Sequence, residues 1–217
     1  RLPDLYLPEP LPHQEDTHRA PQRHKIRRWG RRAGKTKLTT LECVVGHGPI
    51  QADGMPLHRG IAHGGDVYWI APDYPQTAAL WANEIRERFK GLPGVRVNEV
   101  ERTVPLKDFG GGTLWLRSME NIRSVRGSGD RVFGVVGEEA GHYDLEEALQ
   151  SVIGPILTDN EAWLILISTT NAGLDGNKER IAPSFFNRLC QRVMDGEMGA
   201  DWGHVHCTAR DTVVISA

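Results

Sequence analysis

The segment GRRAGKT, residues 30–36, decides the fold predicted for this chain. A glycine-rich loop of this kind curls its backbone N–H groups around phosphate oxygens, and its lysine reaches the terminal phosphates. Gly34 permits the close approach, Lys35 supplies the charge, and Thr36 offers a hydroxyl to Mg²⁺ at the start of a helix whose N-terminus favours an anion. The usual spacing of such a loop places its first glycine at position 29, where this chain has Trp29.

That spacing leaves an alternative, in which Gly-Lys-Thr is a chance tripeptide at a helix start. The preceding residues 24–29 (HKIRRW) favour the alternative, because their pattern is that of a poor strand. As a phosphate loop, the segment assigns nucleotide binding to Gly30, Arg31, Arg32, Ala33, Gly34, Lys35 and Thr36.

Two carboxylates, Glu138 and Glu139, follow the apolar run 132–136 (VFGVV). In a phosphate-loop ATPase, an acid at such a strand end organises Mg²⁺, and a second acid aligns a water for attack on the γ-phosphate. We therefore assign Glu138, together with Thr36, to the metal. Glu139 is predicted to be catalytic, as is Lys35. The alternative is a charged strand end in solvent.

Short apolar runs alternate with helical patterns along the chain. Strands that are apolar on both faces and spaced by helices predict an α/β fold with a mostly parallel central sheet, flanked by helices on both faces. Residues 46–66 hold six glycines, two prolines and three histidines, and are predicted to form a long surface loop. Strands are expected at 67–71, 113–118, 132–136 and 162–167, and helices around 14–20 and at 36–45, 74–92 and 145–153.

The run 162–167 (AWLILI) ends in the hydroxyl residues Ser168, Thr169 and Thr170. The carboxyl edge of a parallel sheet is where ligands bind in open α/β folds. These residues are therefore predicted to sense the γ-phosphate and to pass its loss to the next element. A helix cap or a turn is the alternative.

Five segments, in this order, make the chain resemble the ATPase domain of large terminase subunits, the DNA-packaging motors of tailed bacteriophages. The resemblance implies a P-loop NTPase fold of the ASCE, RecA-like kind, and it implies that Gln14 reads the adenine. That family has a shortened, arginine-bearing phosphate loop, so the spacing noted above becomes a match. Glu138 stands where the family usually has Asp. The segments are 11–14 (LPHQ), 30–36, 69–76 (WIAPDYPQ), 138–140 (EEA) and 168–170 (STT).

The resemblance also implies a function, namely ATP hydrolysis with Mg²⁺ that powers packaging of double-stranded viral DNA into a procapsid. Arg126, which precedes Gly127, is expected to complete the active site of a neighbouring subunit, with Arg117, Arg123 and Arg131 as alternatives. The partners implied are double-stranded DNA, the portal protein and the small terminase subunit. A homo-oligomeric ring is expected during DNA packaging, and a monomer is expected in isolation. The expected location is the cytoplasm of the host cell, without association with a membrane.

The composition limits these expectations. With 26 Lys and Arg against 28 Asp and Glu, a uniformly basic coat for nucleic acid is excluded, and DNA contacts are expected as local patches. Three cysteines without a CxxC pair predict neither a disulfide framework nor a zinc ribbon. The candidates for DNA contact are Arg23, Lys25, Arg27 and Arg28, then His58, Arg59 and His63, and then Arg117 with Arg123.

Residues 1–217 are expected to form a single ATPase domain, with 1–25 as an N-terminal segment on the adenine side. A C-terminal nuclease domain is expected to be absent, because the acids after residue 175 do not cluster at apolar strand ends. Two other functions stay open. A superfamily 2 helicase shares some motifs, but needs a second RecA-like domain. A scaffold that binds ATP without hydrolysing it is favoured by Trp29 and Glu138, which depart from the usual pattern.

Overall fold

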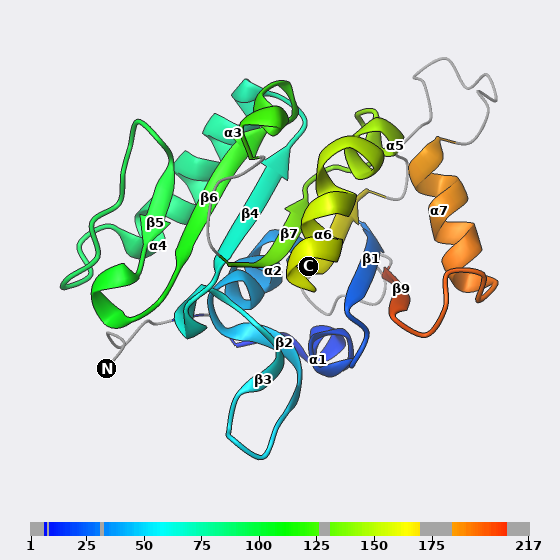
Figure 1. Ribbon diagram of the computed structural model, residues 1–217, viewed down its shortest axis with the longest axis horizontal. Helices are drawn as coiled ribbons and strands as arrows, with labels where there is room; N and C mark the ends of the chain where they lie inside the picture. The colour runs from blue at the N-terminus through cyan, green and yellow to red at the C-terminus, as the bar shows by residue number, and fades with distance from the viewer. Residues whose placement is uncertain (1–6, 8, 31–32, 126–130, 170–183, 208–217) are drawn as a thin grey trace, which may run out of the picture.

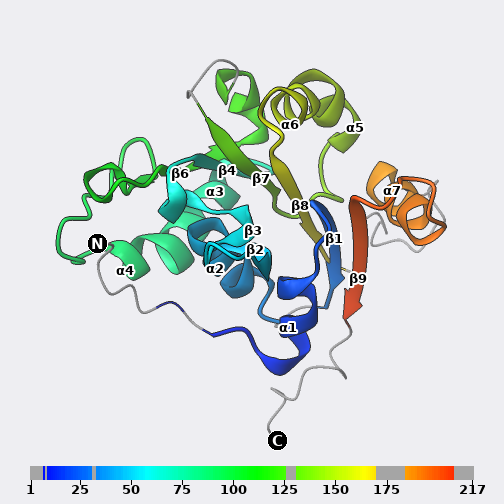
Figure 2. The ribbon, with the colours of Figure 1, turned by 60° about the horizontal axis from the view of Figure 1, so that its bottom comes forward.

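The computed structural model describes residues 7, 9–30, 33–125, 131–169 and 184–207. Its centre is a seven-stranded sheet in the order β5-β6-β4-β7-β8-β1-β9, beside a separate two-stranded sheet, β2-β3 (Figures 1 and 2). The strands are His24–Trp29 (β1), Gly46–Ile50 (β2), Pro56–Arg59 (β3), Asp66–Ala71 (β4), Thr103–Pro105 (β5), Thr113–Ser118 (β6), Val132–Gly137 (β7), Trp163–Ser168 (β8) and Trp202–Cys207 (β9). The α-helices are Pro12–Arg19 (α1), Lys35–Val45 (α2), Tyr74–Leu80 (α3), Arg86–Phe89 (α4), Leu145–Ala148 (α5), Gly154–Asn160 (α6) and Phe185–Met194 (α7).

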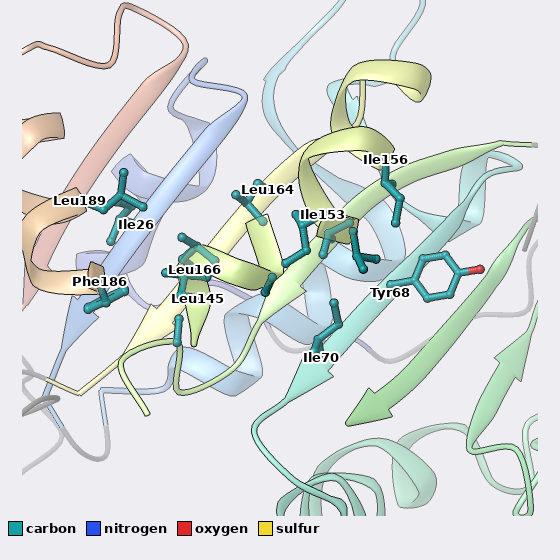
Figure 3. Packing of buried hydrophobic residues seen from close by; sticks show 14 of the residues in the cluster. Ile26, Tyr68, Ile70, Leu145, Ile153, Ile156, Leu164, Leu166, Phe186 and Leu189 are labelled. Atoms are coloured by element: carbon teal, nitrogen blue, oxygen red, sulfur yellow. The ribbon is translucent and has the colours of Figure 1, made fainter. Parts of the chain in front are cut away.

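The large sheet is parallel from β6 to β9, and within its described part only β5 runs antiparallel to its neighbour. Successive residues of its central strands serve opposite faces. On one face, Leu164 and Leu166 of β8 pack with α5, α6 and α7 (Figure 3). On the other face, Ile165 and Ile167 pack with α2, α3 and α4. The predicted mostly parallel sheet with helices on both faces is confirmed.

Helical segments are found where the sequence predicts them, with different bounds, and the segment predicted at 74–92 ends at Phe89. A π-helical turn at Trp81–Ile85 joins α3 to α4, and another at Leu149–Ile153 joins α5 to α6, so the predicted helix at 145–153 continues to Asn160. No helix among the described residues is long and apolar enough to cross a membrane. Residues 184–207 hold an amphipathic helix, α7, and an edge strand, β9, which the sequence analysis did not predict.

The poor strand pattern of residues 24–29 was misleading, since β1 lies inside the sheet, between β8 and β9. Two of its charged side chains, Lys25 and Arg27, are buried and paired. Arg27 has no exposed surface and donates two hydrogen bonds to Glu42 of α2, while the Lys25 ammonium donates to the Thr17 carbonyl at 2.7 Å. Lys25 and Arg27 are therefore excluded as surface contacts for DNA.

The prediction of a long surface loop at 46–66 is wrong. Gly46, at φ 98°, ends α2 in a backbone conformation that favours glycine, and the chain then pairs with itself as the β2–β3 hairpin. The indole N–H of Trp163 donates to the Arg59 carbonyl at 2.9 Å, and His47 is buried. Gly46 and Gly60 allow close backbone approaches at this hairpin, because a Cβ atom at either position would meet a backbone atom at less than 3.0 Å.

Candidate nucleotide site at the carboxyl end of the sheet

The predicted site residues meet at one edge of the sheet. Strands β7, β8 and β1 are adjacent (Figure 2) and parallel, so their carboxyl ends point the same way. The phosphate-loop segment follows β1, the acidic pair follows β7, and Ser168 ends β8. In the parallel register Arg28 pairs with Ser168, and Gly137 pairs with Leu166. Three segments that lie far apart in sequence therefore converge where open α/β folds bind ligands.

The end of the phosphate-loop segment is shaped as a helix start. Gly34, at φ 73°, precedes the first residue of α2. This left-handed backbone favours glycine, and a side chain at the position would in addition come within 2.7 Å of the Gln14 Nε2 atom, so that Gln14 would have to shift. Lys35 is buried, and its ammonium donates to the carbonyls of Trp29 at 3.0 Å and Gly30 at 3.1 Å. Of the predicted nucleotide-binding residues, Arg31 and Arg32 lie outside the described residues.

Gln14 contacts the loop. The side chain is 2% exposed; its Nε2 donates to the Ala33 carbonyl at 3.0 Å, and its Oε1 accepts from the backbone N–H of Leu11 at 3.0 Å. His13 Nε2 lies 3.2 Å from the same Ala33 oxygen. Both polar atoms of the predicted adenine reader are thus paired within the protein, to the cap of α1 and to the loop.

Glu138 continues the line of β7. Its backbone N–H donates to the Ile70 carbonyl at 2.8 Å, and its Oε2 accepts from the indole of Trp69 at 3.1 Å. Burial raises the pKa of Glu138 to about 7, and the charge of Glu139 adds to this, while Lys35 and the indole act in the opposite direction. Because the charge of Lys35 acts on Glu138, the start of α2 and the acidic pair lie near one another.

Glu139 turns away from the strand. Its φ of 47° lies in the left-handed region, which costs a residue with a side chain about 1–2 kcal/mol. The carboxylate accepts from the Ser168 hydroxyl at 3.4 Å and from the Thr169 N–H at 3.3 Å, and His142 Nε2 lies 3.7 Å away. The predicted catalytic acid and two of the three predicted coupling residues are therefore in contact. Thr170 and Arg126 lie outside the described residues.

The donor set fits a magnesium ion. The carboxylate of Glu138 and the hydroxyl of Thr36 are hard oxygen ligands, and both side chains are partly exposed. Among the described residues no group of three His, Cys, Asp or Glu side chains forms a metal cage. Mg²⁺ is usually held by one or two protein oxygens together with substrate phosphates and water. Glu138 also accepts no second hydrogen bond from the described residues, which leaves Oε1 for this role.

Sequence reasoning missed Trp69 as a site residue. The segment WIAPDYPQ drew attention to the end of β4, but the contact between Trp69 and Glu138 depends on the register of β4 against β7. Nothing in the sequence fixes that register. The early strand β1 was likewise missed, although it carries the phosphate loop into the site.

Comparison with known proteins identifies the fold. No family model matches the sequence, and no curated protein does. The ATPase domain of the Thermus phage P74-26 large terminase superposes with a TM-score of 0.60 and 17% identity, covering 95% of this chain and 86% of that one. A mutant of the same domain gives 0.61 and 19%, covering 91% and 81%.

Two longer solved structures share the fold. The bacteriophage HK97 large terminase gives a TM-score of 0.52 and 15% identity, covering 90% of this chain and 37% of that one. The large terminase of a thermophilic bacteriophage, solved in complex with ADP, gives 0.52 and 15%, covering 90% and 42%. The resemblance predicted from five segments is confirmed as a shared fold, that of large terminase ATPase domains.

Proposed function

We propose that this chain is an ATP-hydrolysing motor domain that moves double-stranded viral DNA into a procapsid. One observation carries the proposal. The carboxylate of Glu139 contacts Ser168 and Thr169 at the edge of the sheet where the phosphate-loop segment also begins, because β7, β8 and β1 are adjacent and parallel. Loop, acidic pair and coupling strand thus form one site on a fold shared with phage packaging ATPases. A neighbour solved in complex with ADP supports nucleotide binding at this fold.

The triphosphate binds against the backbone of residues 30–36. To reach it, the Lys35 ammonium exchanges its bonds to the Trp29 and Gly30 carbonyls for phosphate oxygens. Thr36 and Glu138 are the residues that would hold Mg²⁺, which when bound neutralises charge on the β- and γ-phosphates. Glu139 orients a water and accepts its proton as the water oxygen bonds to the γ-phosphorus. The bond to the β–γ bridging oxygen breaks, and that oxygen leaves with ADP.

Loss of the γ-phosphate then changes the position of the end of β8. Because the Ser168 hydroxyl also accepts from the Gly141 N–H at 3.3 Å, it bridges Glu139 to the turn that follows the acidic pair. A change at the γ-phosphate that moves Glu139 therefore moves this turn and the end of β8 together. We assign the coupling role to Ser168 and Thr169 on this basis, and Thr170, which lies outside the described residues, keeps the role that the resemblance implies.

The remaining parts of the motor are proposals as well. Arg126 acts in trans in a homo-oligomeric ring, and the portal protein and small terminase subunit are partners in the host cytoplasm. DNA phosphates are bound by basic side chains that are partly exposed and make no sequence readout. Of the candidates, those that the structure describes as partly exposed are Arg23, Arg28, His58, Arg59, His63 and Arg117.

The Lys35→Ala variant is expected to bind ATP about 10- to 100-fold more weakly, because a charge-assisted hydrogen bond to phosphate contributes about 1.5–3 kcal/mol. Titration calorimetry with a non-hydrolysable ATP analogue measures the loss. Lys37→Ala is the matched control, since Lys37 is exposed on the same helix. Equal affinities for the Lys35→Ala variant and the wild type would remove the ammonium from the site.

The Gln14→Ala variant is expected to weaken ATP and GTP by the same factor, about fivefold, which corresponds to one neutral hydrogen bond. The reason is that both polar atoms of the amide already bond within the protein, to Leu11 and to Ala33, so that the side chain supports the loop for either nucleotide. Competition binding with both nucleotides measures the ratio, with the exposed Glu15→Ala as control on the same helix. A loss confined to ATP would instead assign Gln14 to the adenine.

A phosphate-release assay with protein in excess, with and without duplex DNA, tests the proposed activity against the alternative of a non-hydrolysing scaffold. The wild type is expected to release phosphate in a single turnover. Binding of the nucleotide without any release would favour the scaffold.

A further inference from the structure

Trp69 lies on β4, directly beside the strand that ends in the acidic pair. The parallel register pairs Trp69 with Val136, and side chains two residues apart on a strand share a face, so Trp69 and Glu138 lie on the same side of the sheet. The indole N–H meets the Glu138 carboxylate at 3.1 Å. The contact therefore follows from the register of β4 against β7, and movement of surface side chains does not change it.

The indole is a rigid donor. Trp69 has no exposed surface and belongs to the core on this face of the sheet, with Val44, Val136 and Ile165 in the same cluster. Because such a core is close-packed, the ring cannot turn away without opening it. A donor fixed in this way holds its acceptor in one position. Binding sites depend on such supporting groups to keep the side chains that contact the ligand in place.

Glu138 needs such an anchor. A glutamate has one more rotatable bond than the aspartate usual at this position of the resembled family, so its carboxylate samples more positions. Two acids, Glu139 and Glu84, also lie near enough to repel it. With Oε2 held by the indole, Oε1 keeps one orientation and remains available.

We infer that Trp69 is a positioning residue that aims the Glu138 carboxylate at Mg²⁺; the inference rests on the proposed function of the site. Ligands to metals are commonly held by hydrogen bonds from behind, and loss of such a partner lowers metal affinity about 10- to 100-fold. The length of Glu138 and the reach of the Trp69 indole are then matched to each other.

The test is the Trp69→Phe variant, which removes the N–H and keeps an aromatic ring. Two quantities are measured by calorimetry with a non-hydrolysable ATP analogue: its affinity in EDTA, and the Mg²⁺ concentration that gives half of the metal-dependent gain. Direct Mn²⁺ binding by electron paramagnetic resonance gives a second measure of the metal. Trp163→Phe is the matched control, because Trp163 is equally buried and its N–H also donates, but to the Arg59 carbonyl, and it begins β8 at the edge away from the site.

The expected result is that Trp69→Phe raises the half-saturating Mg²⁺ concentration about tenfold, leaves affinity in EDTA within about twofold, and differs in this from Trp163→Phe. Equal Mg²⁺ dependence in Trp69→Phe and the wild type would overturn the inference alone. Equal losses with and without metal would also overturn it, since they indicate a merely structural role. A wild type whose affinity does not respond to Mg²⁺ would overturn the proposed function as well.

The Glu138→Asp variant carries the test if Trp69→Phe does not fold. Shortening the side chain by one methylene withdraws the carboxylate from the indole, so Mg²⁺ affinity is expected to fall about tenfold even though the charge is kept. Mg²⁺ affinity in Glu138→Asp equal to that of the wild type would show that the indole contact does not matter. Where both variants fold, adding Trp69→Phe to Glu138→Asp is expected to cause no further loss.

Discussion

The Glu139→Gln variant is expected to bind ATP as the wild type does and to hydrolyse it about 10²- to 10⁴-fold more slowly, the range that general base catalysis contributes. Glutamine has the size of glutamate, and its carbonyl oxygen can still accept from the Ser168 hydroxyl and the Thr169 N–H. It cannot accept a proton from the attacking water. The measurement is single-turnover phosphate release together with calorimetry.

Glu161→Gln is the matched control for this variant. Glu161 has a left-handed φ of 52°, close to the 47° of Glu139, but it is exposed at the end of α6 and far along the chain from the loop. A glutamine at either position meets the same backbone demand. Turnover that is normal in Glu139→Gln would contradict the assignment, and turnover that falls equally in both variants would point to folding and not to chemistry.

The Glu42→Gln variant is expected to lower the free energy of unfolding by about 3–5 kcal/mol, the cost of leaving one partner of a buried ion pair uncompensated. Arg27 and Glu42 have no exposed side-chain surface, and the guanidinium donates to both carboxylate oxygens. The pair joins β1 to α2, the two elements that the phosphate-loop segment connects. Denaturant unfolding measures the change.

The control for this experiment is Asp53→Asn, which breaks the exposed pair with Arg59 at 3.1 Å. Exposed pairs contribute about 0–1 kcal/mol, so this variant is expected to unfold nearly as the wild type does. If both variants lost a similar free energy of unfolding, the buried pair would contribute no more to stability than the exposed one.

The same pair predicts an acid dependence. Burial alone would raise the pKa of Glu42, but the charge of Arg27 and the hydrogen bonds from His18 and Arg27 lower it below its ordinary value of 4.5. A carboxylate with a lowered pKa in the folded state stabilises the protein above the unfolded pKa and loses this contribution as the pH falls. The wild type should therefore lose more stability on acidification below about pH 4.5 than Glu42→Gln does.

The motifs predicted the site because each carries its chemistry locally. Gly34 allows the backbone to curl around a phosphate, and Lys35 supplies an ammonium group. Because the sheet is parallel, the carboxyl ends of its strands lie at one edge, whatever their order in the sheet. The pattern did not predict β1, because Lys25 and Arg27 read as surface charges until Thr17 and Glu42 are known to face them. Which residues pair over such distances in sequence is decided by the tertiary structure.

Two other misses have different causes. The β2–β3 hairpin is rich in glycine, and composition alone does not distinguish a tight hairpin from a loop. Helix α7 was open to prediction, since Phe186, Leu189, Cys190 and Val193 follow the spacing of one helical face and all are buried. The indole behind Glu138 was not, since it depends on which residues of two strands stand side by side.

A crystal structure with Mg²⁺ and a non-hydrolysable ATP analogue would show directly where the nucleotide binds. We expect the triphosphate between the Lys35 ammonium and the Glu139 carboxylate, with the metal beside Thr36 and Glu138 and the indole of Trp69 still bonded to Oε2. An analogue bound elsewhere, such as the cavity of about 560 Å³ between α1 and β2 that Glu15 and His18 help to line, would contradict this expectation.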